Sequence, residues 1–255
     1  MLGMMTSDLF ILTGASRGMG LAMAQQLLSP QHVLLCLSRH ANPALAGLAQ
    51  QSACSLEHHI LDLQDPVRAA DALAQWLKSA SQGPFSSATL INNAGVIPSI
   101  APLSASEPVE LSHALRVGLE APMLLTSVFL NITQSWGVPR RVLNISSGLG
   151  RRAMASQAAY CAVKAGMDHF TRCLALDEAI KENGAKVCSL APGVIDTDMQ
   201  VQLRSAKTTD FPDQGSFSQL KDSGRLSSPS DAAERVLAFL FKPEFGTSAV
   251  ADVRD

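Results

Sequence analysis

Three side chains in the middle of the sequence, Ser147, Tyr160 and Lys164, could together move a proton to or from a substrate oxygen. Tyr160 and Lys164 are four residues apart, so on a helix they share one face. Because a nearby ammonium group favours the phenolate, we expect Lys164 to lower the pKa of Tyr160 from about 10 towards neutrality. Ser147, 13 residues before Tyr160, would hydrogen-bond the substrate oxygen as charge develops on it. A Tyr-x-x-x-Lys pair alone is more often a surface pair, so the elements around it decide its meaning.

The segments on either side of these residues have patterns that could bring them together. Residues 141–145 are predicted to form a short buried strand, whose C-terminal end places Ser147 where a side chain can face a cleft. Residues 156–183 are predicted to form a helix that carries Tyr160 and Lys164 and ends at Asn183-Gly184.

Apolar runs of strand length alternate with helical patterns along the whole sequence. Such a rhythm is typical of a Rossmann-type, doubly wound parallel sheet with helices on both faces and its site along the C-terminal strand ends. We find no repeat or interdomain linker, so we expect one α/β domain over residues 1–255. The predicted strands, about seven in number, are 9–13, 32–37, 55–61, 88–91, 141–145, 187–190 and 248–253, and the predicted helices are 21–29, 65–80 (stopped by residues 82–84), 107–136, 156–183 and 229–241.

One long segment breaks this rhythm. Residues 200–228 are polar, with Gly, Ser and Pro late in the stretch, and they are long for a connection inside a compact domain. Long loops of this kind are often lids, so we expect a substrate lid at about 194–228.

The turn after the first predicted strand is rich in glycine, with Gly14, Gly18 and Gly20 in a short span. Glycines allow a tight turn and close backbone approach, and the free N–H groups at the start of the following helix suit a phosphate. A strand before and a helix after favour a dinucleotide site, although a glycine-rich connection without a ligand is the alternative.

The second predicted strand ends in Ser38 and Arg39, where NAD-binding folds usually place an acidic residue for the ribose hydroxyls. A hydroxyl and a guanidinium would suit a 2′-phosphate instead, and Arg17 could add a second cation. The sequence therefore predicts NADP(H), with two solvated arginines as the alternative. Further polar or small residues follow the other predicted strands, at Asp62-Leu63, Asn92-Asn93-Ala94-Gly95 and Pro192-Gly193. A buried asparagine pair usually braces backbone or ligand, although a simple turn is also compatible.

Composition narrows the classes of protein that fit. Hydrophobic residues make up 47% of the chain and charged ones 16%, which is typical of a globular protein. A net charge of −2 without a Lys/Arg cluster argues against nucleic-acid or anionic-membrane partners. We expect the five cysteines, which form no C-x-x-C pair, to be reduced core residues of a cytoplasmic protein. Residues 1–5 lack a basic side chain, so no signal peptide is expected, no apolar run approaches the ~20 residues of a membrane span, and the six histidines lack metal-ligand spacing.

Taken together, the motifs resemble those of the short-chain dehydrogenase/reductase family over nearly the whole chain. The resemblance implies that Tyr160 donates a proton to a carbonyl, that Lys164 lowers its pKa and holds the nicotinamide ribose, and that Ser147 orients the substrate. It also implies hydride transfer between NADP(H) and a carbonyl or alcohol carbon, without a metal. The residues that would bind the cofactor are Gly14, Ser16, Arg17, Gly18, Met19, Gly20, Ser38, Arg39, Asp62, Leu63, Asn93, Ala94, Gly95, Tyr160, Lys164, Pro192, Gly193, Ile195 and Thr197.

Within the family, residues 191–200 and 248–255 look closer to the sepiapterin reductases and bacterial benzil reductases. This resemblance implies that Asp252 anchors the substrate, because a carboxylate can accept two hydrogen bonds from an aminopyrimidine ring. An exposed acidic tail is the alternative. The expected substrate-binding residues are Ser147, Tyr160, Gly193, Met199 and Asp252.

One position departs from the family pattern. The family usually has Asn in the long central helix, and counting back from Thr126 puts Gly118 at that position. Glycine inside a helix costs about 1 kcal/mol relative to alanine. We therefore include Gly118 in the predicted catalytic set. Without the asparagine side chain, the proton relay behind Lys164 should be less well held, and we expect Gly118→Asn to raise turnover.

The sequence thus predicts an NADPH-dependent carbonyl reductase for a small aromatic or heterocyclic ketone or diketone. Two alternatives stay open: an alcohol-oxidising NAD-linked dehydrogenase of the same family, and a non-catalytic dinucleotide-binding protein. The helices over 107–136 and 156–183 are apolar over more than one stripe, so we expect them to form a homodimer or homotetramer interface.

Overall fold

The computed structural model describes residues 6–80 and 85–255, and these are built around one parallel sheet. Its seven strands lie in the order β3-β2-β1-β4-β5-β6-β7, and every adjacent pair is parallel. This confirms the predicted doubly wound sheet. The strands are β1 (Ser7–Thr13), β2 (His32–Ser38), β3 (Ser55–Ile60), β4 (Phe85–Asn92), β5 (Arg140–Ile145), β6 (Lys186–Ala191) and β7 (Val250–Asp252).

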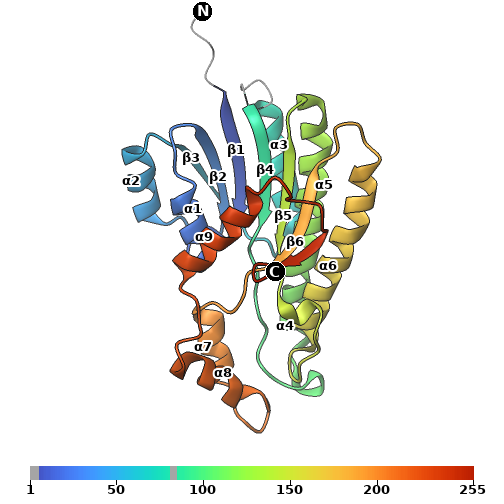
Figure 1. Cartoon of the computed structure of the whole chain (residues 1–255). Coiled ribbons are helices and arrows are strands. Elements are labelled where there is room, and N and C mark those ends of the chain that lie inside the picture. Colours follow the sequence, from blue (N-terminus) through green and yellow to red (C-terminus); the bar gives the residue numbers. More distant parts are fainter. Residues whose placement is uncertain (1–5, 81–84) are drawn as a thin grey trace, which may run out of the picture.

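Helices cover both faces of the sheet (Figure 1). One face carries α1 (Gly18–Gln26), α2 (Pro43–Gln51) and α9 (Pro229–Leu240), and α1 packs along α9. The other face carries α3 (Pro66–Ala80), α5 (Ala121–Thr133) and α6 (Ala158–Ala179), and α4 (Pro108–Leu115) packs against α6. Two further helices, α7 (Asp198–Arg204) and α8 (Gln214–Asp222), project beyond the C-terminal strand ends in Figure 1.

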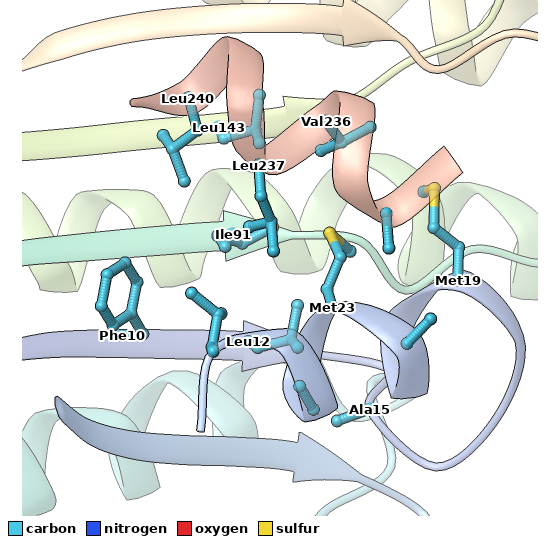
Figure 2. Close-up of a cluster of buried hydrophobic side chains, with 14 of the residues drawn as sticks. Phe10, Leu12, Ala15, Met19, Met23, Ile91, Leu143, Val236, Leu237 and Leu240 are labelled. Carbon is cyan, nitrogen blue, oxygen red and sulfur yellow. The ribbon is translucent and has the colours of Figure 1, made fainter. Parts of the chain in front are cut away.

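The core on the α1 and α9 face holds the glycine turn in place. Leu12 from β1, Met23 from α1 and Val236 from α9 are fully buried in one cluster, which Figure 2 shows between these helices and the sheet. Full burial of each such side chain stabilises the fold by about 1.5–3 kcal/mol. Because the turn from Gly14 to Arg17 joins β1 directly to α1, this packing fixes both of its ends.

The long helix on the opposite face is continuous but irregular. After α4, a π-helical turn (Arg116–Glu120) leads into α5, and a 3-10 turn (Gln134–Trp136) ends the helical segment. Among the described residues, this segment alone is long and apolar enough to span a membrane. The inner side of α5 lies against the sheet, because Leu125 and Phe129 belong to the buried cluster of that face. It is therefore a core helix.

Some expected boundaries differ from those observed. Helix α2 had not been predicted, although Asn42 caps it and Pro43 begins it, as good start signals do. The segment over 200–228 is not a structureless loop but contains α8 and most of α7. The predicted helix stop at residues 82–84 and the interpretation of residues 1–5 lie outside the described residues.

The prediction that all cysteines are core residues was partly wrong. All five thiols are free, and Cys36, Cys54 and Cys188 are buried. Cys161 is half-buried and Cys173 exposed, because both lie on α6 away from its inner face.

Candidate active site

A cavity of about 940 Å³ runs along the C-terminal ends of the strands. It brings together almost every residue predicted from the motifs. Parallel strands place the residues after them along one edge, so motifs far apart in the sequence converge there. The cavity is lined by Gly14, Ser16, Arg17, Gly18, Met19, Gly20, Ser38, Arg39, Asp62, Leu63, Asn93, Ala94, Gly95, Ser147, Tyr160, Lys164, Pro192, Gly193, Ile195, Thr197, Met199 and Asp252. Gly118 is absent from its wall.

Tyr160 and Lys164 lie on the inner face of α6, one turn apart, and both are buried, with 9% and 5% of their surface exposed. The Lys164 ammonium is 5.7 Å from the centroid of the Tyr160 ring. It donates a hydrogen bond of 2.7 Å to the carbonyl oxygen of Ile145, at the end of β5. Ser147 follows two residues later, and its hydroxyl accepts a bond of 3.2 Å from the Leu149 N–H. Helix α6 and strand β5 thus hold the three side chains around one end of the cavity.

The expected effect of Lys164 on Tyr160 was wrong for this structure. Burial raises the pKa of Tyr160 to about 12, and hydrogen bonding with Ser147 opposes this only in part. Burial also lowers the pKa of Lys164 to about 8, against the attraction of Asp168. Removal from water penalises both charged forms, and it is the largest cause of each shift. Tyr160 therefore keeps its proton at neutral pH.

The glycine turn has the close contacts of a phosphate cradle. A Cβ on Gly20 would lie 2.1 Å from the Gly14 carbonyl oxygen, so no other residue fits there. Asn93 donates its side-chain N–H to the carbonyls of Thr13 and Gly14, at 2.9 and 3.3 Å. The asparagine therefore braces backbone, and the backbone N–H groups at the start of α1 stay available for the diphosphate of a dinucleotide. The residues present fit that ligand.

The two arginines at the far end of the cavity differ in their partners. Arg17 donates a 2.6 Å hydrogen bond to the carboxylate of Asp198 at the start of α7, with both side chains exposed. Arg17 also lines the cavity, so its role as a second cation for a 2′-phosphate stays a prediction, with Asp198 as a competing partner. Arg39 is exposed on the cavity wall. The Ser38 hydroxyl donates to the His40 carbonyl oxygen and lies 2.6 Å from His58 Nε2, so it braces the turn that presents Arg39.

Asp252 does not lie in an exposed tail, which was the alternative to a role in substrate binding. Its side chain is buried at the end of β7 and accepts two hydrogen bonds from the Arg254 guanidinium, at 2.7 and 2.6 Å. These bonds hold the pKa of Asp252 below its ordinary value, although burial opposes the shift. The carboxylate is therefore charged and fixed in direction.

Gly118 lies in the π turn behind the site, and its expected role is corrected by what it contacts. A Cβ at this position would be 2.5 Å from Cγ1 of Val163 on α6. Val163 precedes Lys164, so the absence of a side chain at Gly118 lets α6 approach closely. This close packing is a physical reason for a glycine at position 118. The expectation that Gly118→Asn raises turnover is thus reversed.

Several residues of the cavity wall were missed from the sequence. Gln157 is 2% exposed, donates its side-chain N–H to the Ser156 carbonyl, and leaves its own amide oxygen without a hydrogen-bond partner. Its place one turn before Tyr160 was an available signal. The rest are mainly apolar side chains without a motif: Val96, Ile97, Val117, Leu149, Met154, Leu203 and Phe217. No group of three or more metal-ligating side chains occurs within residues 6–80 and 85–255.

Comparisons with known proteins agree with this geometry. A protein described as benzil reductase ((S)-benzoin forming) from Bacillus cereus is 39% identical over 235 residues, which cover 92% of this chain and 94% of that protein. Sepiapterin reductase from Meriones unguiculatus is 33% identical over 260 residues, covering 96% of this chain and 95% of that protein.

Solved structures share the fold. A short-chain dehydrogenase/reductase from Burkholderia vietnamiensis superposes with a TM-score of 0.67 at 31% identity, covering 99% of each chain. A metagenomic short-chain oxidoreductase in complex with NADP superposes with a TM-score of 0.70 at 24% identity, covering 97% of this chain and 96% of that one. The sequence profile described as short chain dehydrogenase matches residues 9–208. The chain therefore belongs to the short-chain dehydrogenase/reductase family, whose oxidoreductases act on CH–OH and C=O groups.

Proposed function

We propose that this protein is an NADPH-dependent reductase of small aromatic or heterocyclic ketones and diketones. The observation that carries the proposal is the meeting of Ser147, Tyr160 and Lys164 in the cavity that also holds the glycine turn. When bound, NADPH supplies a hydride to the carbonyl carbon. Tyr160 gives its proton to the carbonyl oxygen, and the Ser147 hydroxyl steadies that oxygen as charge develops.

The protonation states favour reduction over alcohol oxidation. A proton donor must hold its proton at the working pH, and the pKa of Tyr160, about 12 in its buried site, meets this requirement. Lys164, with a pKa of about 8, is mostly a cation at neutral pH and can stabilise the tyrosinate left after transfer. Oxidation would need Tyr160 as a base, which its burial opposes.

The choice of NADPH over NADH rests on Arg39. It lies on the cavity wall after β2, where no carboxylate stands to hold free ribose hydroxyls. Arg39→Asp would remove a charge-assisted bond of about 1.5–3 kcal/mol. We expect KM for NADPH to rise at least tenfold while KM for NADH changes little. Arg225→Asp, the same charge change at an exposed arginine outside the cavity, is the control. Equal effects of Arg39→Asp on both cofactors would contradict this assignment.

The substrate end of the cavity is apolar with one polar corner. Leu149, Met154, Met199, Leu203 and Phe217 supply the apolar wall, and Asp252 with Arg254 supplies the corner. Such a site suits an aromatic ring with a few hydrogen-bonding groups, as in benzil or sepiapterin, the substrates that name its relatives.

The deciding experiment is a panel of carbonyl compounds, including benzil, sepiapterin and simple aldehydes, each with NADPH and with NADH. We expect the aromatic compounds to be reduced with NADPH. If no carbonyl is turned over while NADPH binds, a non-catalytic dinucleotide-binding protein is the better description.

Residues 194–228 form a lid in this proposal. Met199, Leu203 and Phe217 from this segment line the cavity. Contacts from this segment to the body include the Arg17–Asp198 ion pair, a 3.1 Å hydrogen bond from the Gln202 side chain to the Pro98 carbonyl, and a hydrogen bond from the Ser156 hydroxyl to the Asp210 carbonyl. Because few contacts of this kind hold the segment against the body, it can open for substrate entry.

Exposed apolar side chains on the outer helices favour an oligomer. Leu176 and Ile180, at the end of α6, are 72% and 88% exposed, and Leu115 and Met123 on the neighbouring long helix are also exposed. A second copy of this chain would bury them, giving a homodimer or homotetramer of the kind that the family commonly forms. The five free thiols fit a cytoplasmic location. Light scattering that shows a monomer at micromolar concentration would contradict the oligomer.

A further inference from the structure

Asp168 is a buried carboxylate directly behind the catalytic side chains. It lies on α6 one turn after Lys164 and is 1% exposed. Its Oδ1 accepts hydrogen bonds from the hydroxyls of Ser146 and Ser189, at 2.6 and 2.7 Å. Its Oδ2 has no hydrogen-bond partner, and the nearest cation is the Arg151 guanidinium, with Nε at 3.7 Å. A buried carboxylate with a bare oxygen is costly for stability, so its presence calls for a reason.

Asp168 and Lys164 together hold the end of β5. Lys164 donates to the carbonyl oxygen of Ile145, and Asp168 accepts from the side chain of the next residue, Ser146. Two side chains one turn apart on α6 therefore hydrogen-bond two consecutive residues, Ile145 and Ser146. Ser147 follows immediately. The bond to Ser189 ties the same carboxylate to β6, the neighbouring strand. This arrangement fixes Ser147 relative to Tyr160.

The loop after β5 packs closely over Asp168 and Lys164. A Cβ on Gly150 would lie 2.8 Å from Asp168 Oδ2 and 2.9 Å from the Lys164 carbonyl oxygen, so the backbone packs closely over this part of the helix. The charged or titratable groups around the carboxylate are Lys164 on its own helix, Arg151 from the loop after β5, and Cys188 on β6. Burial raises the pKa of the Cys188 thiol to about 12, so Cys188 is neutral near pH 8.

We propose that Asp168 is a positioning residue of the reaction, which holds the end of β5 in place and keeps Lys164 a cation despite its burial. Only the expected effect of Asp168 on the rate of reduction rests on the proposed reductase function. The direction of the effect agrees with the pKa of Lys164, which Asp168 raises against the larger effect of burial.

The test measures the titration of Lys164 by NMR in the cofactor-free protein with 13C-labelled lysine, where Lys164→Met identifies the signal. In the original chain we expect a pKa of about 8. In Asp168→Asn it should fall by about one unit or more, because the isosteric amide removes the charge. In Arg151→Gln it should rise, because the carboxylate then acts on Lys164 without a competing cation. Ser189→Ala, which removes one hydrogen bond and keeps the carboxylate, should leave it unchanged.

Opposite shifts in the two charge variants cannot come from a general loosening of the fold. The alkaline limb of the pH profile of kcat/KM with NADPH should move in the same directions as the NMR titration. A folded Asp168→Asn protein with an unshifted Lys164 would overturn the inference. Should Asp168→Asn fail to fold, an unchanged or lowered pKa in Arg151→Gln would overturn it instead. If the original chain reduces no carbonyl, the proposed function fails, whereas the NMR comparison still decides the role of Asp168.

Discussion

A side chain at Gly118 should disturb the catalytic helix, and the size of the effect follows from the contact with Val163. A Cβ would lie 2.5 Å from Val163 Cγ1, whereas ordinary van der Waals contact begins at 3.4 Å. Val163 is buried and β-branched, so its rotamer cannot change cheaply. Overpacking of this kind destabilises the fold by about 1–3 kcal/mol. The better helix propensity of alanine offsets about 1 kcal/mol of that loss. Gly118→Ala should therefore lower the free energy of unfolding by up to about 2 kcal/mol.

A double-mutant cycle can test that account. Val163→Ala alone removes two methyl groups from the core and should cost about 2–3 kcal/mol, as loss of burial plus a cavity. In Gly118→Ala/Val163→Ala the new methyl group enters the space that Val163 leaves. Urea unfolding should then show the double variant to be about 2 kcal/mol more stable than the sum of the single changes predicts.

The kinetic consequence follows from the position of Val163 beside Lys164. Gly118→Asn, which is larger than alanine, should lower kcat by tenfold or more, because displaced α6 carries Lys164 and Tyr160 with it. Additive single changes, or a Gly118→Ala protein stabilised by about 1 kcal/mol as propensity alone would give, would refute the packing argument.

Three other outcomes are expected. Tyr160→Phe should reduce turnover by about 10²–10⁴ while NADPH binding, measured by fluorescence titration, stays nearly intact. Asp252→Asn should lower kcat/KM for a pterin-like ketone far more than for benzil, which has no N–H to offer, and equal losses would make Asp252 structural. Burial lowers the pKa of Lys164 from 10.5 to about 8, so the unfolded chain binds that proton more tightly, and the free energy of unfolding should rise between about pH 8 and 9. Lys164→Met should flatten this rise in urea unfolding. Above about pH 9 the raised pKa values of Cys36 and Cys188 reverse the trend, and that of Tyr160 adds to the reversal above about pH 10.

The sheet and the line of motifs could be predicted because each depends on short stretches of sequence. Strands such as Leu34 to Leu37 are buried on both faces, so their apolar runs are unbroken. Motif residues that follow strands meet at one edge whatever the register, which is why the cavity wall matched the expectation so closely. Helix α2 was missed because its small residues have little amphipathic pattern, although its cap was visible.

What could not be predicted depends on pairs of residues that only the folded chain brings together. The contact of Gly118 with Val163 depends on how closely two helices approach, and no local pattern encodes that distance. The Arg17–Asp198 ion pair joins positions 181 residues apart. The pKa of Tyr160 was misjudged for a related reason. Sequence spacing shows that Lys164 is near, but it does not show how completely both groups are removed from water.

The segment that carries α7 and α8 begins and ends at one point of the molecule. Ile195 and Ser227 form a parallel bridge, with hydrogen bonds from the Asp196 N–H to the Ser227 carbonyl and from the Ser227 N–H to the Val194 carbonyl. Residues 196–226 are therefore an insertion between β6 and α9, and its length can change without moving either element. The entropic cost of lengthening such an insertion grows only with the logarithm of its length. Replacing this segment should therefore change which carbonyl compound the proposed reductase recognises, while α6 still carries Tyr160 and Lys164.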